Sequence, residues 1–406
     1  MSDRKTLLPT LESVIWKCNT ARCATALLYF VNEDTLRHLD LGFSDYFSVD
    51  IPEARAVLTS LADLDLRLSV CKLRMLEDSP FEHPVGDGLM WAVGRFLSSI
   101  KSVRTLSLSP SLLSQDVFEV LAQLDNVTSF SVIGREPNRP WPTVLPTEDE
   151  AELSRLPFQS LALMETLHVG IATCNAMLQR GRLQALTDIR VWTAYLPPVD
   201  AVMDFISAAG QISQLQALSL SVSAAIPLEE DRREYALIAA AFHPLYECSR
   251  LRSLELSLAC PTILTPTDVE LMIQAWPLLR VLRLSGAGCE AINFRSRLNF
   301  ATLLQLAESL PDLRVLQIDI NADLSGVDLE RVNHCTQDEM DRRCRLETLD
   351  VGWAWWPPNG PSREDITDAL LDIFPHGNMD LKWDTQLPKH ATMRWRDVRE
   401  AVIMYR

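Results

Sequence analysis

The residues that could hold a metal ion are few and scattered along the sequence. None of the seven histidines belongs to an HExxH sequence, and the nine cysteines form no CxxC pair. Zinc sites, catalytic and structural, pair their ligands at such short spacings. The nearest approaches are Cys18-x4-Cys23 and His334-Cys335 followed by Cys344, which fit none of these patterns. We therefore expect neither a metal nor a cofactor.

Catalytic chemistry is equally hard to place on this sequence. G-x-S-x-G, P-loop and G-x-G-x-x-G motifs are absent, and only 14 glycines are available for a phosphate-binding loop. His168, Asp188 and Ser219 have the residue types of a catalytic triad and could lie on adjacent strands. Rows of polar residues also arise on any strand face that meets solvent, so this grouping needs no catalytic explanation. We expect a protein that is not an enzyme.

The elements that would position these side chains follow from a short internal repeat. Its pattern is apolar, two residues, apolar, one residue, apolar, as in the segment Leu36–Leu41 (LRHLDL). Successive copies start 22 to 42 residues apart, with a mean near 30. Self-similarity at this period indicates a stacked repeat architecture. Twelve copies begin at Leu11, Leu36, Leu61, Val103, Val127, Met164, Leu186, Leu215, Leu251, Leu279, Leu313 and Leu346.

Each copy predicts a short strand with one buried face, because its last three positions alternate apolar, other, apolar. The middle one of these, the fifth position of the repeat, is polar in every copy after the first. The flanking fourth and sixth positions are almost all aliphatic. The fifth positions are Asp40, Asp65, Ser107, Ser131, His168, Arg190, Ser219, Glu255, Arg283, Gln317 and Asp350.

Most of these strands are followed by a predicted helix with one apolar face. Apolar residues recur at i, i+3, i+4 and i+7, the spacing of an amphipathic helix. This spacing occurs in residues 93–100, 117–124, 202–209, 269–276, 303–310 and 366–373. Thr267 and Glu270 predict a capping box at the start of the fourth of these helices. Three helices are expected to end before Pro277, Pro311 and Pro375.

A strand and a helix every 30 residues predict a leucine-rich-repeat solenoid. This is an α/β horseshoe with parallel strands on its concave face and helices on its convex face. The Asn that usually follows the last apolar position is missing, so we expect irregular repeats whose turns satisfy their backbone groups by other means. We expect one array of about twelve units over residues 1–352 and a capping segment of the same solenoid over residues 353–406.

Two insertions and the tryptophan-rich end interrupt the array. The insertions lie near residues 70–88 and 134–157, where prolines are dense. The second is either an insertion without function or a docking loop. Five of the ten tryptophans fall after residue 350. They either close the exposed end of the core or serve in part as an exposed anchor.

Composition narrows the class of partner. Lys and Arg number 38 against 54 Asp and Glu, a net charge of −16, which disfavours nucleic acid or an anionic membrane as the partner. The chain is 47% hydrophobic, which excludes a wholly disordered protein. Its first residues lack the apolar core of a secretory signal, and no run of about 20 apolar residues occurs. We expect an intracellular protein, cytoplasmic or nuclear, with reduced cysteines.

The repeat region resembles that of basidiomycete F-box proteins with leucine-rich repeats. Leu7–Trp16 (LLPTLESVIW) and Thr35–Leu41 (TLRHLDL) are similar to their opening segments. Leu349–Gly352 (LDVG), Asp372–Pro375 (DIFP) and Trp395–Val398 (WRDV) are similar to how they finish. The resemblance implies a ubiquitin-ligase adaptor whose repeats present a substrate and whose F-box binds a Skp-type protein. Only ten residues precede Leu11, so an F-box is expected upstream of Met1 or not at all.

The function expected from these observations is protein–protein interaction through the concave face. One interpretation is substrate recognition for a ubiquitin ligase. The alternative is a stand-alone scaffold or inhibitor with no ligase role. Trp and Arg are the commonest energetic anchors of interfaces. The candidate partner-binding residues are His168, Arg190, Trp192, Glu255 and Arg283, which are otherwise simply solvated residues of the strands.

Lysine is unusually scarce. Only six of the 38 basic residues are lysine, and none lies between Lys101 and Lys382. Codon bias towards arginine would explain this. So would avoidance of self-ubiquitination in a protein that works beside a ubiquitin ligase.

Overall fold

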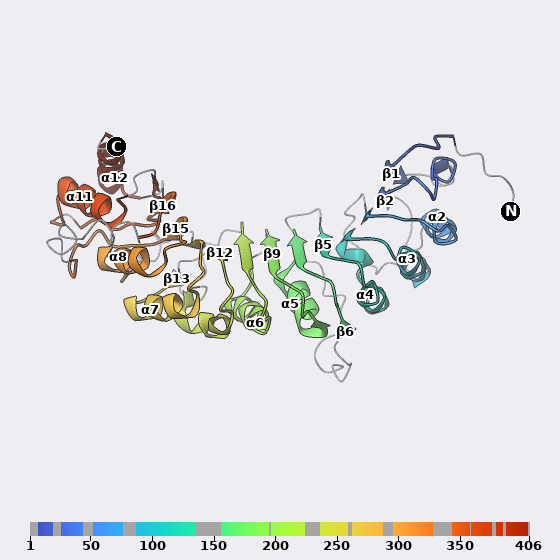
Figure 1. Ribbon diagram of the computed structural model, residues 1–406, viewed down its shortest axis with the longest axis horizontal. Helices are drawn as coiled ribbons and strands as arrows, with labels where there is room; N and C mark the ends of the chain where they lie inside the picture. Colours follow the sequence, from blue (N-terminus) through green and yellow to red (C-terminus); the bar gives the residue numbers. More distant parts are fainter. Residues whose placement is uncertain are drawn as a thin grey trace. The chain divides into compact units, whose positions relative to one another are not determined.

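The chain divides into two compact units, Met1–Tyr195 and Leu196–Arg406. In each unit parallel strands form one layer and helices the other (Figure 1). The computed structural model describes residues 7–18, 26–43, 52–75, 87–134, 156–194, 196–223, 236–258, 262–286, 295–327, 343–357, 359–375, 379–384 and 387–404.

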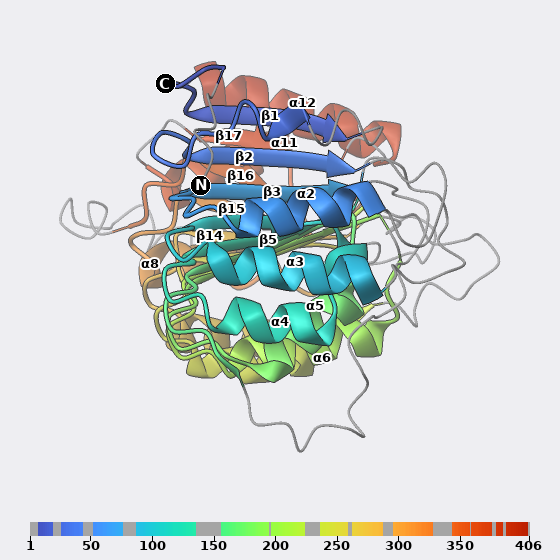
Figure 2. The ribbon, with the colours of Figure 1, turned by 90° about the vertical axis from the view of Figure 1, so that its right-hand side faces the viewer.

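The first unit contains a parallel sheet whose described strands follow the chain order. Figure 2 shows its first strands pointing the same way, with three helices stacked in the same order on one side. The strands are β1 (Ser13–Cys18), β2 (His38–Phe43), β3 (Val70–Met75), β4 (Thr105–Leu108), β5 (Ser129–Ile133), β7 (Leu163–Leu167) and β9 (Asp188–Thr193). The helices are α2 (Pro52–Ala62), α3 (Asp87–Ser99), α4 (Gln115–Ala122) and α5 (Ile171–Arg180), with the 3-10 turn η1 (Pro110–Leu112). A small second ladder pairs β6 (Leu156–Pro157) with β8 (Gly181–Arg182).

The second unit repeats the same arrangement. Its strands are β10 (Ala217–Val222), β12 (Ser253–Leu258), β14 (Val281–Gly286), β15 (Val315–Ile318), β16 (Thr348–Asp350) and β17 (Asp380–Lys382). Its helices are α6 (Val199–Gly210), the 3-10 helix η4 (Ala239–Glu247), α7 (Pro266–Ala275), α8 (Phe300–Ser309), α11 (Arg363–Ile373) and α12 (Lys389–Met404). The short strands β11 (Leu237–Ile238) and β13 (Thr262–Ile263) pair with each other.

The strand layer confirms the leucine-rich-repeat solenoid as the fold class. Leu39, Leu106, Leu254 and Leu316 each lie in a parallel strand, and none is more than 1% exposed. Burying a leucine side chain contributes roughly 1.5–3 kcal/mol. The apolar fourth and sixth positions therefore hold each strand against the helix layer, and each repeat covers the core of the next.

Two of the twelve predicted copies are in the wrong frame. Leu64–Leu66 precedes the strand, and the third strand is β3, in which Cys71 pairs with Leu39. In the sixth repeat, Glu165 rather than His168 pairs with Ser131 and Arg190. The frames that fold are Leu68-x2-Cys71-x-Leu73 and Leu161-x2-Met164-x-Thr166. The predicted frames were wrong because residues at their fourth and sixth positions do not pair with those of the neighbouring strands.

The predicted helices are confirmed, with one correction at a helix start. The six stretches with helical spacing coincide with α3, α4, α6, α7, α8 and α11, and three of these end two residues before Pro277, Pro311 and Pro375. The capping box of α7 is formed by Thr265 and Asp268, not by Thr267 and Glu270. Thr265 has extended backbone and lies directly before Pro266, which favours the first position of a helix.

The predicted insertion near residues 70–88 is wrong at its beginning, since residues 70–75 form β3. Residues 76–86 and 135–155 lie outside the described residues. The turns are bonded irregularly, as expected for repeats without an Asn ladder. For example, the Ser109 hydroxyl accepts a hydrogen bond from the Met75 amide at 2.9 Å.

The tryptophans at the end of the chain are mostly packed inside the second unit. Trp353, Trp356 and Trp395 are buried, and the rings of Trp356 and Trp395 meet edge to face with centroids 5.2 Å apart. The Trp395 indole donates to the Ala354 carbonyl at 3.3 Å. Strand β17 falls within the segment predicted to be a cap, and it extends the register beyond β16. The boundary at residue 352 stays a prediction.

Candidate functional site

The face of each sheet that points away from the helices, called the open face below, carries the fifth positions in register. In the first unit these residues follow one another as Cα partners from strand to strand, and after Ile15 all are polar or charged. They are Ile15, Asp40, Lys72, Ser107, Ser131, Glu165 and Arg190. In the second unit the corresponding residues are Ser219, Glu255, Arg283, Gln317, Asp350 and Lys382. Charged residues thus predominate on the open face, and acids and bases often alternate, but Ser107 and Ser131 are buried.

An aromatic pair stands at the end of β7 and β9 in the first unit. The rings of His168 and Trp192 meet nearly at right angles, 86°, with centroids 3.9 Å apart. The His168 amide donates to the Trp192 carbonyl at 2.9 Å. His168 has a φ of +56°, a left-handed conformation that non-glycine residues rarely adopt. This turn of the backbone brings the imidazole onto the indole, so the pair is built by local geometry as well as by register.

Arg190 lies beside this pair and is largely open to solvent. Its side chain is 57% exposed, and its guanidinium is 4.0 Å from the Asp188 carboxylate, at the limit of an ion pair. Its cross-strand neighbour is Glu165, which holds the fifth position that the sequence assigned to His168. His168, Arg190 and Trp192 are therefore brought together in one unit. Glu165 is the member of this group that the sequence analysis missed.

The geometry gives no support to a catalytic triad. A catalytic histidine donates its second ring nitrogen to a carboxylate that orients it. The Nδ1 atom of His168 is buried and has no hydrogen-bond partner among the described residues. The Asp188 carboxylate instead accepts from the Thr187 hydroxyl at 2.7 Å. Loss of hydration lowers the pKa of His168 from its usual 6.5, which favours the neutral imidazole.

In the second unit, Glu255 and Arg283 form the ion pair that the sequence placed on adjacent strands. The two residues are Cα partners, and the guanidinium donates to the Glu255 carboxylate at 2.7 Å. The Ser253 hydroxyl donates to the other carboxylate oxygen at 3.1 Å. The side chains remain 33% and 45% exposed, so the pair adds little to stability and stays accessible to a partner.

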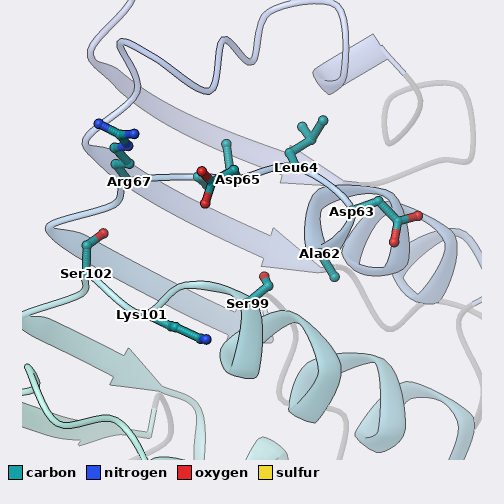
Figure 3. A pocket seen from close by; sticks show the side chains of 9 residues that line it. Ala62, Asp63, Leu64, Asp65, Arg67, Ser99, Lys101 and Ser102 are labelled. Atoms are coloured by element: carbon teal, nitrogen blue, oxygen red, sulfur yellow. The ribbon is translucent and has the colours of Figure 1, made fainter. Parts of the chain in front are cut away.

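A cleft of about 430 Å³ lies in the first unit, away from the open face (Figure 3). It forms between the connection from α2 to β3 and the shorter connection from α3 to β4. Asp65 and Arg67 lie on one side and Lys101 on the other, and all three are exposed. The cleft exists because one of these two connections is longer than the other. Exposed charges of both signs line it, so it favours no particular class of ligand.

Within the described stretches, no group of three or more His, Cys, Asp or Glu side chains could hold a metal ion. His334, Cys335 and Cys23 lie outside those stretches. No described helix combines the length and the hydropathy needed to cross a bilayer.

Neither a protein-family model nor a curated protein sequence matches this chain. Among solved structures, an internalin from Listeria monocytogenes is 12% identical, with a TM-score of 0.45, over 93% of this chain and 81% of the internalin. The Toll–Spatzle complex of Drosophila contains a chain that is 13% identical, with a TM-score of 0.39. That match spans 96% of this chain and half of the other. The parallel ladder of half-buried strands and covering helices defines the present chain as a leucine-rich-repeat solenoid.

Proposed function

We propose that this chain is a protein–protein interaction module whose partner docks on the open face. The observation that carries the proposal is the cluster of the exposed Arg190 with the half-buried Trp192 and His168 on a hydrogen-bonded sheet. A partner that docks on preformed strands orders few new groups, so little conformational entropy is lost. Trp and Arg side chains provide the largest energetic contributions in most interfaces.

The two units would contribute in different ways. Trp192 supplies apolar area next to Arg190, whose guanidinium is available to a partner carboxylate because its own acidic neighbour is 4.0 Å away. Arg283 is already engaged by Glu255 at 2.7 Å. A partner carboxylate that binds Arg283 would replace the existing ion pair with Glu255 by a new one. Such a contact should alter the association rate and its salt dependence more than the affinity.

The finer proposal is that the repeats present a substrate to a ubiquitin ligase, as the resemblance to F-box proteins implies. The absence of lysine between Lys101 and Lys382 supports it, because a chain held beside a ligase is protected by having few acceptor amines. Buried free thiols at Cys71, Cys174, Cys248 and Cys344 support an intracellular location. A stand-alone scaffold or inhibitor uses the same open face without a ligase.

The docking proposal is tested with paired variants that differ only in the face they alter. Trp192→Ala removes the open-face anchor, whereas Trp91→Ala removes a tryptophan that is 55% exposed on helix α3. A partner is first captured with the wild-type chain and then titrated, as purified protein, against each variant. We expect Trp192→Ala to weaken binding by about 30-fold and Trp91→Ala to leave it unchanged. The opposite pattern, or no change with either variant, would contradict docking on the open face.

The ligase proposal is tested separately. The full-length gene product, including any exons upstream of Met1, is expressed with its Skp-type adaptor and purified. Co-elution of the two proteins supports ligase membership. A chain that binds its open-face partner but never the adaptor is a stand-alone scaffold. Extensive ubiquitination of the chain itself, found by mass spectrometry, would remove the explanation offered for its few lysines.

A further inference from the structure

Three aspartates from three successive repeats lie at the ends of β15, β16 and β17, and the carboxylates of Asp350 and Asp384 act electrostatically on Asp319. Asp319 directly follows β15, Asp350 ends β16, and Asp384 comes two residues after β17. Asp319 is 7% exposed, whereas the fifth and seventh positions of most repeats remain in contact with solvent. The segment Val351–Trp356, which follows β16, runs alongside Asp319, because Asn321 and Trp355 pair in a parallel bridge and the Trp353 amide contacts Asp319.

Asp319 fastens that segment by a short contact at its centre. Its Oδ1 atom accepts a hydrogen bond from the Trp353 amide at 2.6 Å. Gly352 has a φ of +55°, and a Cβ atom there would lie 2.2 Å from the same oxygen. Backbone bonds continue the attachment, since the Ala322 amide donates to the Trp355 carbonyl at 2.8 Å and the Asp384 amide to the Gly352 carbonyl at 3.0 Å.

The second oxygen of Asp319 is in an unfavourable position when it carries charge. Oδ2 is buried and has no hydrogen-bond partner among the described residues. A buried carboxylate without donors loses its hydration and gains little in return. The Oδ1 of Asn321, two residues along, is a second buried oxygen that lacks a donor in the described chain. A proton on Asp319 would remove the charge and turn its unpaired buried oxygen into a donor.

The charged groups around Asp319 act in the same direction. Burial raises the pKa of Asp319, the hydrogen bond from the Trp353 amide lowers it, and the carboxylates of Asp350 and Asp384 raise it, so that the net pKa is about 7. Burial also raises the pKa of Asp350, with Asp384 adding to the effect, while Lys382 and Arg283 lower it. Lys382 and Arg283 thus stabilise the negative charge of Asp350, whereas no cation of the described chain acts in this way on Asp319.

We propose that Asp319 is a proton-operated latch, which holds the Val351–Trp356 segment against the end of β15 when protonated and loosens it when ionised. The direction follows from the two states of the chain. A carboxyl with a raised pKa binds its proton more tightly when folded than when unfolded. Its contribution to stability is therefore complete below about pH 4 and is lost as the pH rises through about 7. The latch lies beside Asp350, so its release also changes charge and order at this end of the open face.

The test compares the wild-type chain with Asp319→Asn, which keeps the Oδ1 acceptor and cannot ionise. Between about pH 5 and about pH 8, we expect the folding equilibrium constant of the wild type to fall roughly 100-fold more than that of Asp319→Asn, measured by urea unfolding. Asp312→Asn removes an exposed carboxylate from the turn before β15 and should follow the wild type. Equal pH dependence in wild type and Asp319→Asn would overturn the proposal.

A second measurement needs no variant and reports the latch directly. Hydrogen exchange of the amides in residues 351–356 of the wild-type chain is measured from about pH 6 to about pH 8 and corrected for intrinsic chemistry. These amides should lose protection as the pH rises, whereas amides in β12 and β14 should keep theirs. Protection that stays constant in residues 351–356, or that falls equally in β12, would refute a local latch even if Asp319→Asn failed to fold.

Discussion

Replacing Gly352 by alanine gives the most quantitative test of the segment that packs beside Asp319. Two costs combine. A left-handed φ of +55° costs a residue with a Cβ atom about 1–2 kcal/mol. The new Cβ would lie 2.2 Å from Asp319 Oδ1, so that oxygen must move and the 2.6 Å hydrogen bond from the Trp353 amide is lost. At about pH 6 Asp319 carries its proton, and a hydrogen bond between uncharged groups contributes about 0.5–1.5 kcal/mol. We expect Gly352→Ala to destabilise the protein by about 1.5–3.5 kcal/mol at this pH.

Two matched variants separate these costs. Gly326 also has a positive φ, +82°, but the nearest atom to its added Cβ is Ala301 Cβ at 3.6 Å. Gly326→Ala should therefore cost only the conformational part, about 1–2 kcal/mol. In an Asp319→Ala background the overlap disappears, and the cost of Gly352→Ala should fall to the same level. The unfolding free energies are measured by urea titration with far-UV circular dichroism at one pH. Additive effects of Gly352→Ala and Asp319→Ala would refute the reasoning.

Three further outcomes are expected. Trp395→Ala removes a fully buried indole from α12, the helix that we propose closes the core. It should destabilise the protein by about 3–5 kcal/mol and raise amide hydrogen exchange in α11 and α12. A loss of stability below about 1 kcal/mol would exclude that role. In a double-mutant cycle of Glu255→Ala and Arg283→Ala, the coupling in unfolding free energy should be no more than about 1 kcal/mol, since both side chains are partly exposed; a larger coupling would show a structural rather than a recognition role. The Cys71 thiol should resist alkylation in the folded chain and react in urea, as followed by peptide mass spectrometry, because burial and the nearby Asp40 raise its pKa; rapid labelling of the native protein would contradict its burial.

The fold could be predicted from sequence because each repeat obeys a local rule. A polar residue between two buried ones specifies which strand face meets the helices, and the apolar stripe of each helix specifies the other half of the unit.

The two errors of frame have a common origin. Leu61-x2-Leu64-x-Leu66 fits a leucine pattern better than Leu68-x2-Cys71-x-Leu73, although cysteine packs as a small apolar residue. With the corrected frames, successive repeats start 24 to 36 residues apart instead of 22 to 42. Regular spacing was thus the signal that could have identified both.

The candidate site was predicted only in part, because register fixes positions on a face but not contacts between side chains. Glu255 and Arg283 could be paired from sequence, since both are fifth positions of consecutive repeats. The contact between His168 and Trp192 could not, because it depends on a left-handed turn at a residue that the sequence placed inside a strand. Glu165 was missed for the same reason, as the shifted frame put it at the second position of the pattern.

Asp319 illustrates what the missing Asn ladder means for these repeats. An Asn side chain buried after a strand both accepts from one neighbouring backbone group and donates to another. Asp319 can only accept while it is ionised, so it bonds the Trp353 amide and leaves Oδ2 without a donor. A protonated carboxyl regains the donor and imitates the amide. Asparagine at position 319 should therefore make the chain more stable than the wild type near pH 8 and give little advantage near pH 4, where the wild type carries the proton itself.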